Sequence, residues 1–290
     1  MPFFVNNKKC NSMAKKNNRR SVSVIKKSEV YSADPQPIEC VIADMSERIL
    51  KIQRDLLMPA IIFEKNKIQH TITFFGASRI KPEAEAKAEL AKVKKNPNAK
   101  DYAQKLKMAR RAVASSKYYT AAQELSRRLQ EWINLQKFTP EEEIYIMTGG
   151  GPGIMEAAAK GAHLAGGTPV GATISIHCEQ PNEYVSQGIS FNFNYFLMRK
   201  FWLLFFAKAI VVFPGGVGTF DELFEVFTLI KTRKTQGRIP MVLFGKKFWK
   251  SAVNFKTLID ADVITEKDLD LIEYVDSVEE AFKYITSNIK

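Results

Sequence analysis

Five short β-rich runs recur along this chain, and stretches long enough for helices separate them. The runs are apolar without strict alternation, which is typical of strands that helices cover on both faces. Strands that alternate with helices form parallel sheets through crossover connections. We therefore predict an α/β fold, a Rossmann-like doubly wound parallel sheet with helices on both faces. The predicted strands are residues 71–75, 144–148, 170–176, 209–213 and 241–244.

The domain organisation follows from composition and charge. With 46% hydrophobic residues, the chain has enough apolar side chains for a sizeable core. The formal net charge is +12, but residues 1–28 hold eight Lys/Arg and no acid, which leaves 35 basic and 31 acidic residues elsewhere. The charge is therefore concentrated in an arm, and we predict no nucleic-acid-binding face. We predict a basic arm at residues 1–37 and a single domain at 38–290.

Three further segments have helical character. Residues 82–136 are rich in Ala, Lys, Glu and Gln and are broken once at Asn96-Pro97-Asn98, which predicts a helical hairpin insertion. The hairpin is either a solvated helix pair or a surface for a partner or a second copy. Apolar spacing predicts another helix over 43–57. The aromatic-rich segment 191–206 is predicted to be a largely buried helix.

The sequence also limits the compartment. Three widely spaced cysteines argue against a disulfide framework and favour a reducing compartment, with the cytoplasm as the default. The longest apolar stretch, residues 201–213, contains Lys208 and is too short to span a bilayer, so no membrane association is predicted. Residues 1–28 lack the apolar region of a secretory signal, although their composition also suits an organellar transit peptide.

Three of the predicted strands end in glycine-bearing turns, at residues 76–78, 149–153 and 214–219. In an open parallel sheet, ligands bind beyond the carboxyl ends of the strands. Glycine lets backbone N–H groups approach an anion, and a following helix adds its positive dipole end. The three turns together predict a phosphate site. Its predicted residues are Ser78, Gly150, Gly151, Gly215, Gly216, Val217, Gly218 and Thr219.

The common nucleotide motifs are missing. The dinucleotide pattern G-x-G-x-x-G fails at Ile154, which disfavours a nicotinamide oxidoreductase, and the chain has no Gly-Lys-Ser/Thr triplet of a P-loop. The three histidines, His70, His163 and His177, are isolated along the chain. A metal site needs several such ligands at suitable spacing, so we predict no metal and no cofactor.

Two charged residues have a structural and a functional interpretation. Arg199 lies between apolar residues in the predicted buried helix, where a guanidinium needs an anion. That anion is either a structural carboxylate or a substrate at the sheet edge. Glu222 belongs to the pattern Thr219-x-x-Glu222. In its structural interpretation, this pattern is a capping box for a helix that begins at Thr219, and Glu222 only accepts a backbone N–H.

Taken together, three motifs resemble the LOG family of phosphoribohydrolases, which were formerly taken for lysine decarboxylases. They are Gly149-Gly150-Gly151-Pro152-Gly153-Ile154-Met155-Glu156, Met198-Arg199-Lys200 and Pro214-Gly215-Gly216-Val217-Gly218-Thr219-Phe220-Asp221-Glu222. The resemblance covers about residues 70–290. It implies that Arg199 and Glu222 are catalytic and that Gly216, Gly218 and Thr219 hold a 5'-phosphate. It also implies that Lys200 and Thr228 line the site and that Glu179 is an upstream substrate-binding acid.

The reaction implied by this resemblance is hydrolysis of the N-glycosidic bond of a nucleoside 5'-monophosphate, of the AMP or cytokinin riboside type. The products are the free base and ribose 5-phosphate, and the enzyme is expected to be a homodimer or higher homo-oligomer. The basic arm and the insertion make the chain look more like the larger bacterial members, whose preferred base is often not a cytokinin. Nothing in the sequence supports a lysine decarboxylase with a Schiff-base lysine. The alternative is a non-catalytic carrier or sensor that binds a nucleotide or the molybdenum cofactor.

Overall fold

A computed structural model describes residues 38–136, 138–139, 142–175, 181–232, 234 and 239–289. The chain divides into two compact units, Met1–Arg54 and Asp55–Lys290. Of the first unit, the described residues are the beginning of α2 (Ile38–Lys65), a longer helix than the predicted 43–57. The proposed domain boundary at residue 37 remains a prediction.

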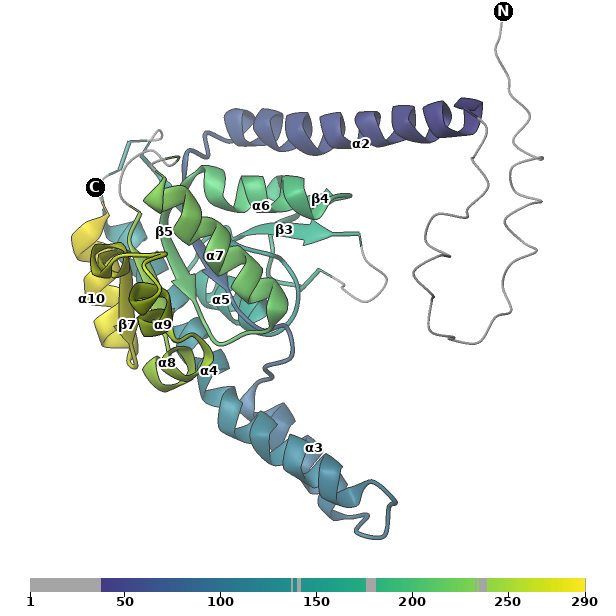
Figure 1. Cartoon of the computed structure of the whole chain (residues 1–290), viewed down its shortest axis with the longest axis vertical. Helices are drawn as coiled ribbons and strands as arrows, with labels where there is room; N and C mark the ends of the chain where they lie inside the picture. The colour runs from purple at the N-terminus through teal and green to yellow at the C-terminus, as the bar shows by residue number, and fades with distance from the viewer. Residues whose placement is uncertain are drawn as a thin grey trace, which may run out of the picture. The chain divides into compact units, whose positions relative to one another are not determined.

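Among the described residues, seven parallel strands form one sheet in the order β4-β3-β2-β1-β5-β6-β7 (Figure 1). This arrangement confirms the α/β fold class, and it contains all five predicted strands. The two strands at the edges, β4 and β7, were not predicted. The strands are β1 (His70–Phe75), β2 (Ile144–Thr148), β3 (Val170–Ile174), β4 (Phe191–Phe193), β5 (Ala207–Val212), β6 (Met241–Phe244) and β7 (Ile272–Val275).

Helices cover both faces of the sheet, and each face has its own hydrophobic cluster. One cluster combines β5 and β6 residues with α6, α7 and the end of α2, and the other combines β1 and β5 residues with α4, α5 and α10. Successive β5 side chains alternate between the clusters: Ile210 and Val212 join the first, and Ala209 and Val211 join the second. The other helices are α3 (Glu83–Lys94), α4 (Tyr102–Leu135), α5 (Ile154–Leu164), α6 (Phe196–Phe205), α7 (Val217–Lys231), α8 (Lys246–Ala252), α9 (Phe255–Asp260) and α10 (Val278–Asn288), with 3-10 turns η1 (Gln187–Ile189) and η2 (Glu266–Leu271).

The strand order reverses beside β1. The chain builds outward from β1 through β2 and β3 to β4, and then returns to place β5 on the other side of β1. This reversal is a topological switch point, and in open α/β sheets ligands bind just beyond the carboxyl ends of the strands at such a point. A ligand is therefore expected at the turns that follow β1, β2 and β5.

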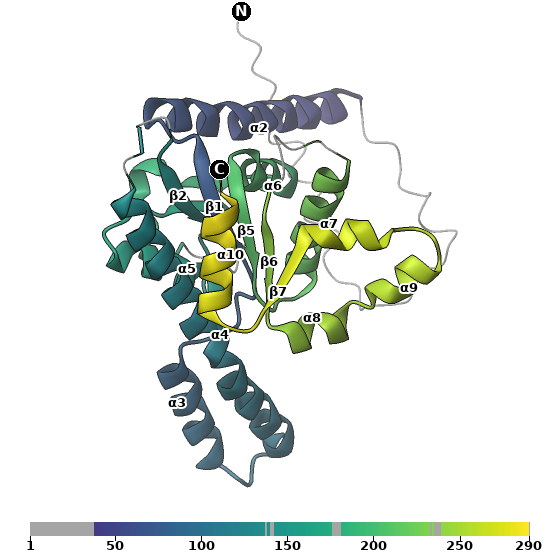
Figure 2. The ribbon, with the colours of Figure 1, turned by 90° about the vertical axis from the view of Figure 1, so that its left-hand side faces the viewer.

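The predicted hairpin insertion is confirmed as α3 and α4, and the chain turns between the two helices at residues 95–101. The second half of α4 packs on α5, where Ala122, Leu125 and Leu129 are fully buried. Figure 2 shows α3 and the start of α4 projecting beyond the sheet, on the side where α8 follows β6. The insertion thus extends from the edge of the sheet at which the glycine turns lie.

The prediction of one buried helix over residues 191–206 is wrong in two respects. Residues 191–193 form strand β4, and the helix begins only at Phe196. Within α6 the buried residues are Arg199, Trp202 and Leu203, while Phe196, Leu197 and Phe205 are 54%, 64% and 51% exposed. The helix is therefore amphipathic toward the sheet and leaves apolar side chains on its outer face.

None of the described helices is both long enough and apolar enough to cross a membrane.

Candidate active site

The three glycine turns meet at the carboxyl edge of the sheet. The Ala77 N–H, after β1, donates to Pro214 O after β5 at 3.2 Å, and Ala77 O accepts from the Ile154 N–H at 3.1 Å. The turn after β1 is therefore hydrogen-bonded to both of the others. The predicted convergence of the three turns is present in the fold.

Backbone conformation and close packing require two of the glycines in the second turn. Gly150 and Gly153 have φ angles of 72° and 74°, a region that L side chains rarely adopt. A Cβ atom on Gly153 would lie 2.4 Å from Ala77 O, and one on Gly150 would lie 2.6 Å from Thr173 Cγ2. Gly153 allows the turns after β1 and β2 to pack closely, and Gly150 allows the second turn to pack against β3, so their presence alone does not indicate a ligand.

The third turn is different, because two of its glycines have no structural neighbour. A Cβ on Gly216 or Gly218 would meet no atom within 4 Å among the described residues, whereas one on Gly215 would lie 2.2 Å from Thr219 Oγ1. The space beside Gly216 and Gly218 is open to a ligand. Packing accounts for Gly215 but not for the other two.

Helix α7 begins earlier than predicted. Its N-cap is Gly216 and its first residue is Val217, so Thr219 is the third residue of the helix and is buried. The predicted capping box of Thr219 and Glu222 is therefore wrong, since a capping box requires Thr219 at the N-cap. The first N–H groups of an α-helix have no intrahelical acceptor, so those of Val217, Gly218 and Thr219 form the positive end of α7.

Arg199 reaches from the first turn of α6 into the second glycine turn. Its side chain is buried, and its Nε and one Nη donate to Ala172 O at 2.7 Å and to Gly149 O at 3.2 Å. Among the described residues, its partners are these carbonyls and the Met155 sulfur rather than a carboxylate. A guanidinium has five N–H donors, so donors remain for an anion at the sheet edge.

Lys200, the next residue, connects α6 to α7 through ion pairs. Its ammonium lies 3.1 Å from Asp221 and 2.9 Å from Glu225. Burial alone would lower the pKa of Lys200, but hydrogen bonds to Glu225 and Asp221 outweigh this cost and raise it. These ion pairs hold α6 beside the first turns of α7.

Two other predicted site residues also lie on α7. Glu222 is half-buried, and it shares a face of the helix with Thr219 because the two are three residues apart. Thr228 is exposed, and its hydroxyl donates to Phe224 O within the helix. It lies nine residues beyond Thr219, or roughly 13 Å along the axis at the α-helical rise. Glu222 is thus near the helix start, and Thr228 is not.

Of the remaining predicted residues, Ser78 belongs to the first turn, and Gly150 and Gly151 belong to the second. Ser78 is half-buried beside Gly153, and Gly150 and Gly151 are buried. Glu179 lies outside the described residues. Asn182 was not predicted from the sequence, although its Nδ2 donates to Gly150 O and Gly151 O, both at 2.9 Å. An Asn after the third strand gives no distinctive signal in the sequence, yet here it fixes the second glycine turn.

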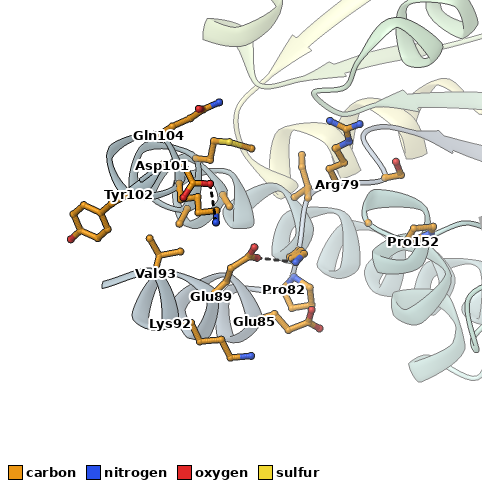
Figure 3. A pocket seen from close by; sticks show the side chains of 18 of the residues that line it. Arg79, Pro82, Glu85, Glu89, Lys92, Val93, Asp101, Tyr102, Gln104 and Pro152 are labelled. Atoms are coloured by element: carbon orange, nitrogen blue, oxygen red, sulfur yellow. Dashed lines mark hydrogen bonds and ion pairs between the residues drawn. The ribbon is translucent and has the colours of Figure 1, made fainter. Parts of the chain in front are cut away.

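A cavity of about 1080 Å³ adjoins two of the turns. It lies between α3, α4 and the turns after β1 and β2, with Pro152 at its edge (Figure 3). Two of its basic residues are paired with acids, Lys81 with Glu89 and Lys105 with Asp101. The residues that line the cavity do not include the third turn or Arg199, so the cavity borders the candidate site without containing it.

Across the described part of the chain, no group of three or more His, Cys, Asp or Glu side chains could hold a metal ion.

Parts of the chain are similar to known proteins. Residues 155–285 match the family model described as "possible lysine decarboxylase". The pyrimidine/purine nucleotide 5'-monophosphate nucleosidases of Escherichia coli K12 and O157:H7 are each 32% identical over 126 residues, which cover 40% of this chain. The match spans only 27% of the length of these curated relatives.

Solved structures of similar fold include two molybdenum cofactor proteins. The cofactor binding protein from the phototrophic bacterium Rippkaea orientalis is 17% identical, with coverage of 77% of this chain and 98% of that one and a TM-score of 0.45. The carrier protein from Chlamydomonas reinhardtii is 20% identical, with coverage of 76% and 96% and a TM-score of 0.43. The family match covers less than half of the chain, and together with the nucleosidase relatives it agrees with the resemblance of the motifs between residues 149 and 222 to the LOG family.

Proposed function

We propose that this protein hydrolyses the N-glycosidic bond of a nucleoside 5'-monophosphate, of the AMP or cytokinin riboside type, to the free base and ribose 5-phosphate. One observation carries the proposal. Arg199 is a buried cation whose described partners are two carbonyls and the Met155 sulfur, and it reaches the second of the three glycine turns that meet at the carboxyl edge of the sheet. Such a charge needs an anion, and the phosphate of a nucleotide supplies one.

The start of α7 is the proposed anchor for the 5'-phosphate. The N–H groups of Val217, Gly218 and Thr219 and the positive end of the helix dipole favour an anion there. The open space at Gly216 and Gly218 allows the phosphate oxygens to approach the backbone. A phosphate held at this point is a remote handle that fixes the position of the ribose C1'.

Glu222 is the proposed catalytic carboxylate. Cleavage of an N-glycosidic bond passes through a transition state with oxocarbenium character at C1', and a nearby carboxylate stabilises that positive charge and orients the attacking water. Glu222 follows the phosphate anchor by one turn of α7, so the phosphate and C1' of one nucleotide could contact the same helix. Arg199 is proposed to position the substrate or to assist departure of the base.

The test is to incubate the protein with a panel of nucleoside 5'-monophosphates and to measure release of ribose 5-phosphate. We expect release from at least one member of the panel and none from the matching nucleosides, which lack the phosphate handle. The Glu222→Gln protein serves as the control for a contaminating hydrolase, because it should purify identically and lack the activity.

The carrier or sensor alternative predicts a different result in the same experiment. A carrier would bind a nucleotide or the molybdenum cofactor at the glycine turns and release no ribose 5-phosphate from any member of the panel. The presence of both Arg199 and Glu222 favours the enzyme, because a carrier needs the glycine turns but not this pair. Tight binding without turnover would overturn the proposed hydrolysis.

A further inference from the structure

Asp55 is a buried carboxylate that none of the three motifs includes. Asp55 lies on α2, and only 3% of the residue is exposed to solvent. The family match starts a hundred residues later, at residue 155. A buried carboxylate requires hydrogen-bond donors, so its partners indicate what it does.

The Asp55 carboxylate accepts hydrogen bonds from the two residues that precede α6. Its Oδ2 accepts from the backbone N–H of Asn194 at 2.7 Å and of Tyr195 at 3.1 Å, and its Oδ1 accepts from Asn194 Nδ2 at 2.8 Å. Tyr195 is the N-cap of α6 and provides no side-chain cap of its own. Asp55 thus supplies, from another helix, the negative charge that a helix N-terminus favours.

A proline on α2 strengthens the same connection. Pro59 lies inside α2 and has no N–H to donate to the carbonyl four residues before it, which is that of Asp55. Trp202 of α6 uses this carbonyl instead, since its Nε1 donates to Asp55 O at 3.1 Å. The Trp202 ring also packs against Phe63 of α2 at 5.5 Å. Asp55 therefore holds α6 at its start and at its second turn.

The contacts continue from Asp55 to Arg199 through one residue, Tyr195. Tyr195, whose N–H is bound by Asp55, accepts the backbone N–H of Arg199 on its own carbonyl at 3.1 Å. The Arg199 side chain then donates to Gly149 O in the second glycine turn. A shift at the start of α6 would move the origin of the Arg199 side chain and break these bonds.

We propose that Asp55 is a positioning residue that fixes Arg199 against the second glycine turn, and hence that the part of α2 from Asp55 onward contributes to the site. The catalytic consequence rests on the proposed nucleotide hydrolysis, whereas the structural consequence does not. Asp55 touches no substrate in this proposal; it acts through the start of α6.

The first experiment measures Arg199 directly and needs no ligand. The Arg199 Nε–H donates to a buried carbonyl, so its NMR signal should exchange slowly with solvent; loss of the signal in Arg199→Lys assigns it. We expect Asp55→Asn to accelerate this exchange by about tenfold or more, because it removes the negative charge and leaves one acceptor oxygen in place of the two that accept the three bonds. The matched control is Asp268→Asn, which changes a carboxylate that accepts from Thr265 N and pairs with Lys231.

Unchanged Arg199 exchange in a folded Asp55→Asn protein would overturn the proposal and leave Asp55 a purely stabilising role. If Asp55→Asn does not fold, Asn194→Ala takes its place, because it removes only the 2.8 Å bond to Oδ1. That variant should accelerate the exchange in the same direction, by a smaller factor. No acceleration in Asn194→Ala would count equally against the proposal.

The second experiment tests the catalytic consequence with AMP as the probe. Asp55→Asn is expected to lower kcat/KM by roughly 10- to 100-fold, the cost of a displacement of about 1 Å at a positioning group. In an Arg199→Lys background the same change should cause no further loss, since both act through one side chain. Additive losses would overturn the proposal. If the wild-type protein hydrolyses no nucleotide, the proposed function fails, and the exchange experiment still decides the role of Asp55.

Discussion

Arg199 carries a positive charge in a buried position, where its described partners are two carbonyls and the Met155 sulfur. The sequence left open whether a structural carboxylate or a substrate balances this charge, and the described contacts favour the substrate. We expect Arg199→Lys to lower kcat/KM by about 100-fold, because an ammonium cannot bridge both carbonyls and an anion. Stability should fall by about 1–3 kcal/mol if a buried acceptor is left unsatisfied. Kinetics on AMP and thermal melting check both values.

The control for this prediction is Arg110→Lys, at an exposed position on α4. It should retain both activity and melting temperature. An Arg199→Lys protein with wild-type kinetics would show that the guanidinium is structural.

Glu222 is the proposed catalytic carboxylate, and its replacement tests that role. With the helix starting at Val217, Glu222 is not the distal member of a capping box, so that explanation for the residue is removed. Glu222→Gln should lower kcat by roughly 100-fold or more, because it removes the negative charge facing the oxocarbenium. Binding of the nucleotide phosphate should be largely retained. The measurements are kcat by ribose 5-phosphate release and affinity for AMP by calorimetry.

The neighbouring acid provides a matched control. Asp221→Asn removes a carboxylate one position away, and Lys200 keeps its second partner, Glu225. This variant should retain nearly full kcat. Equal losses in the two variants would point to the general charge of the helix start rather than to Glu222.

The start of α7 is the element on which phosphate binding depends. Gly218 lies in the first turn with open space at its Cα, so Gly218→Ala should leave stability unchanged or slightly raised, as Ala favours helix over Gly. Its methyl group would occupy the space proposed for the phosphate. We expect the affinity for AMP to fall by about tenfold or more, or about 1.4 kcal/mol. Calorimetry and thermal melting measure the two effects.

Gly215→Ala should behave in the opposite way. Its Cβ would lie 2.2 Å from Thr219 Oγ1, so the protein should lose about 1–3 kcal/mol of stability through overpacking. If Gly218→Ala binds AMP as tightly as the wild type, the phosphate does not lie at this helix start.

The hydrophobic pattern of the sequence predicted most of the helices and strands, but it did not reveal the short ones. The five central strands are buried on both faces and read as apolar runs, and the hairpin is long enough for its composition to be decisive. Strand β4 spans only Phe191–Phe193 and leads into an aromatic helix, so its period of two cannot be separated from the helix pattern. The start of α7 was missed by two residues because Thr219 resembles an N-cap, although Gly216 occupies that position.

The site was predictable where backbone chemistry fixes it and not where it depends on distant contacts. Glycine turns at strand ends converge in any open parallel sheet, so their meeting follows from the pattern. Asn182 and Asp55 act through hydrogen bonds to segments 32 and 139 residues away in sequence. Single polar residues of this kind leave no periodic signal, and only the fold reveals their partners.

At the scale of the whole molecule, the outer face of α6 requires explanation. Phe196, Leu197, Phe201 and Phe205 expose between 37% and 64% of their surface on one short helix. Apolar side chains gathered in this way mark interaction surfaces in soluble proteins. We propose that a second copy of the chain covers this face in a homodimer or higher homo-oligomer, because symmetric self-association is the commonest arrangement.

Light scattering at micromolar concentration tests the association, and a monomeric wild-type protein would refute it. Leu197→Glu places a charge on the most exposed apolar residue of α6, so it should shift the protein toward monomer, since an unpaired charge buried at an interface costs several kcal/mol. Val263→Glu alters a residue of similar exposure, 61%, between α9 and η2, and should leave the assembly intact. Leu197 lies two residues before Arg199, so the monomeric variant should be assayed as well. Retention of Arg199 exchange protection with loss of association would separate the outer face of α6 from its inner, site-forming face.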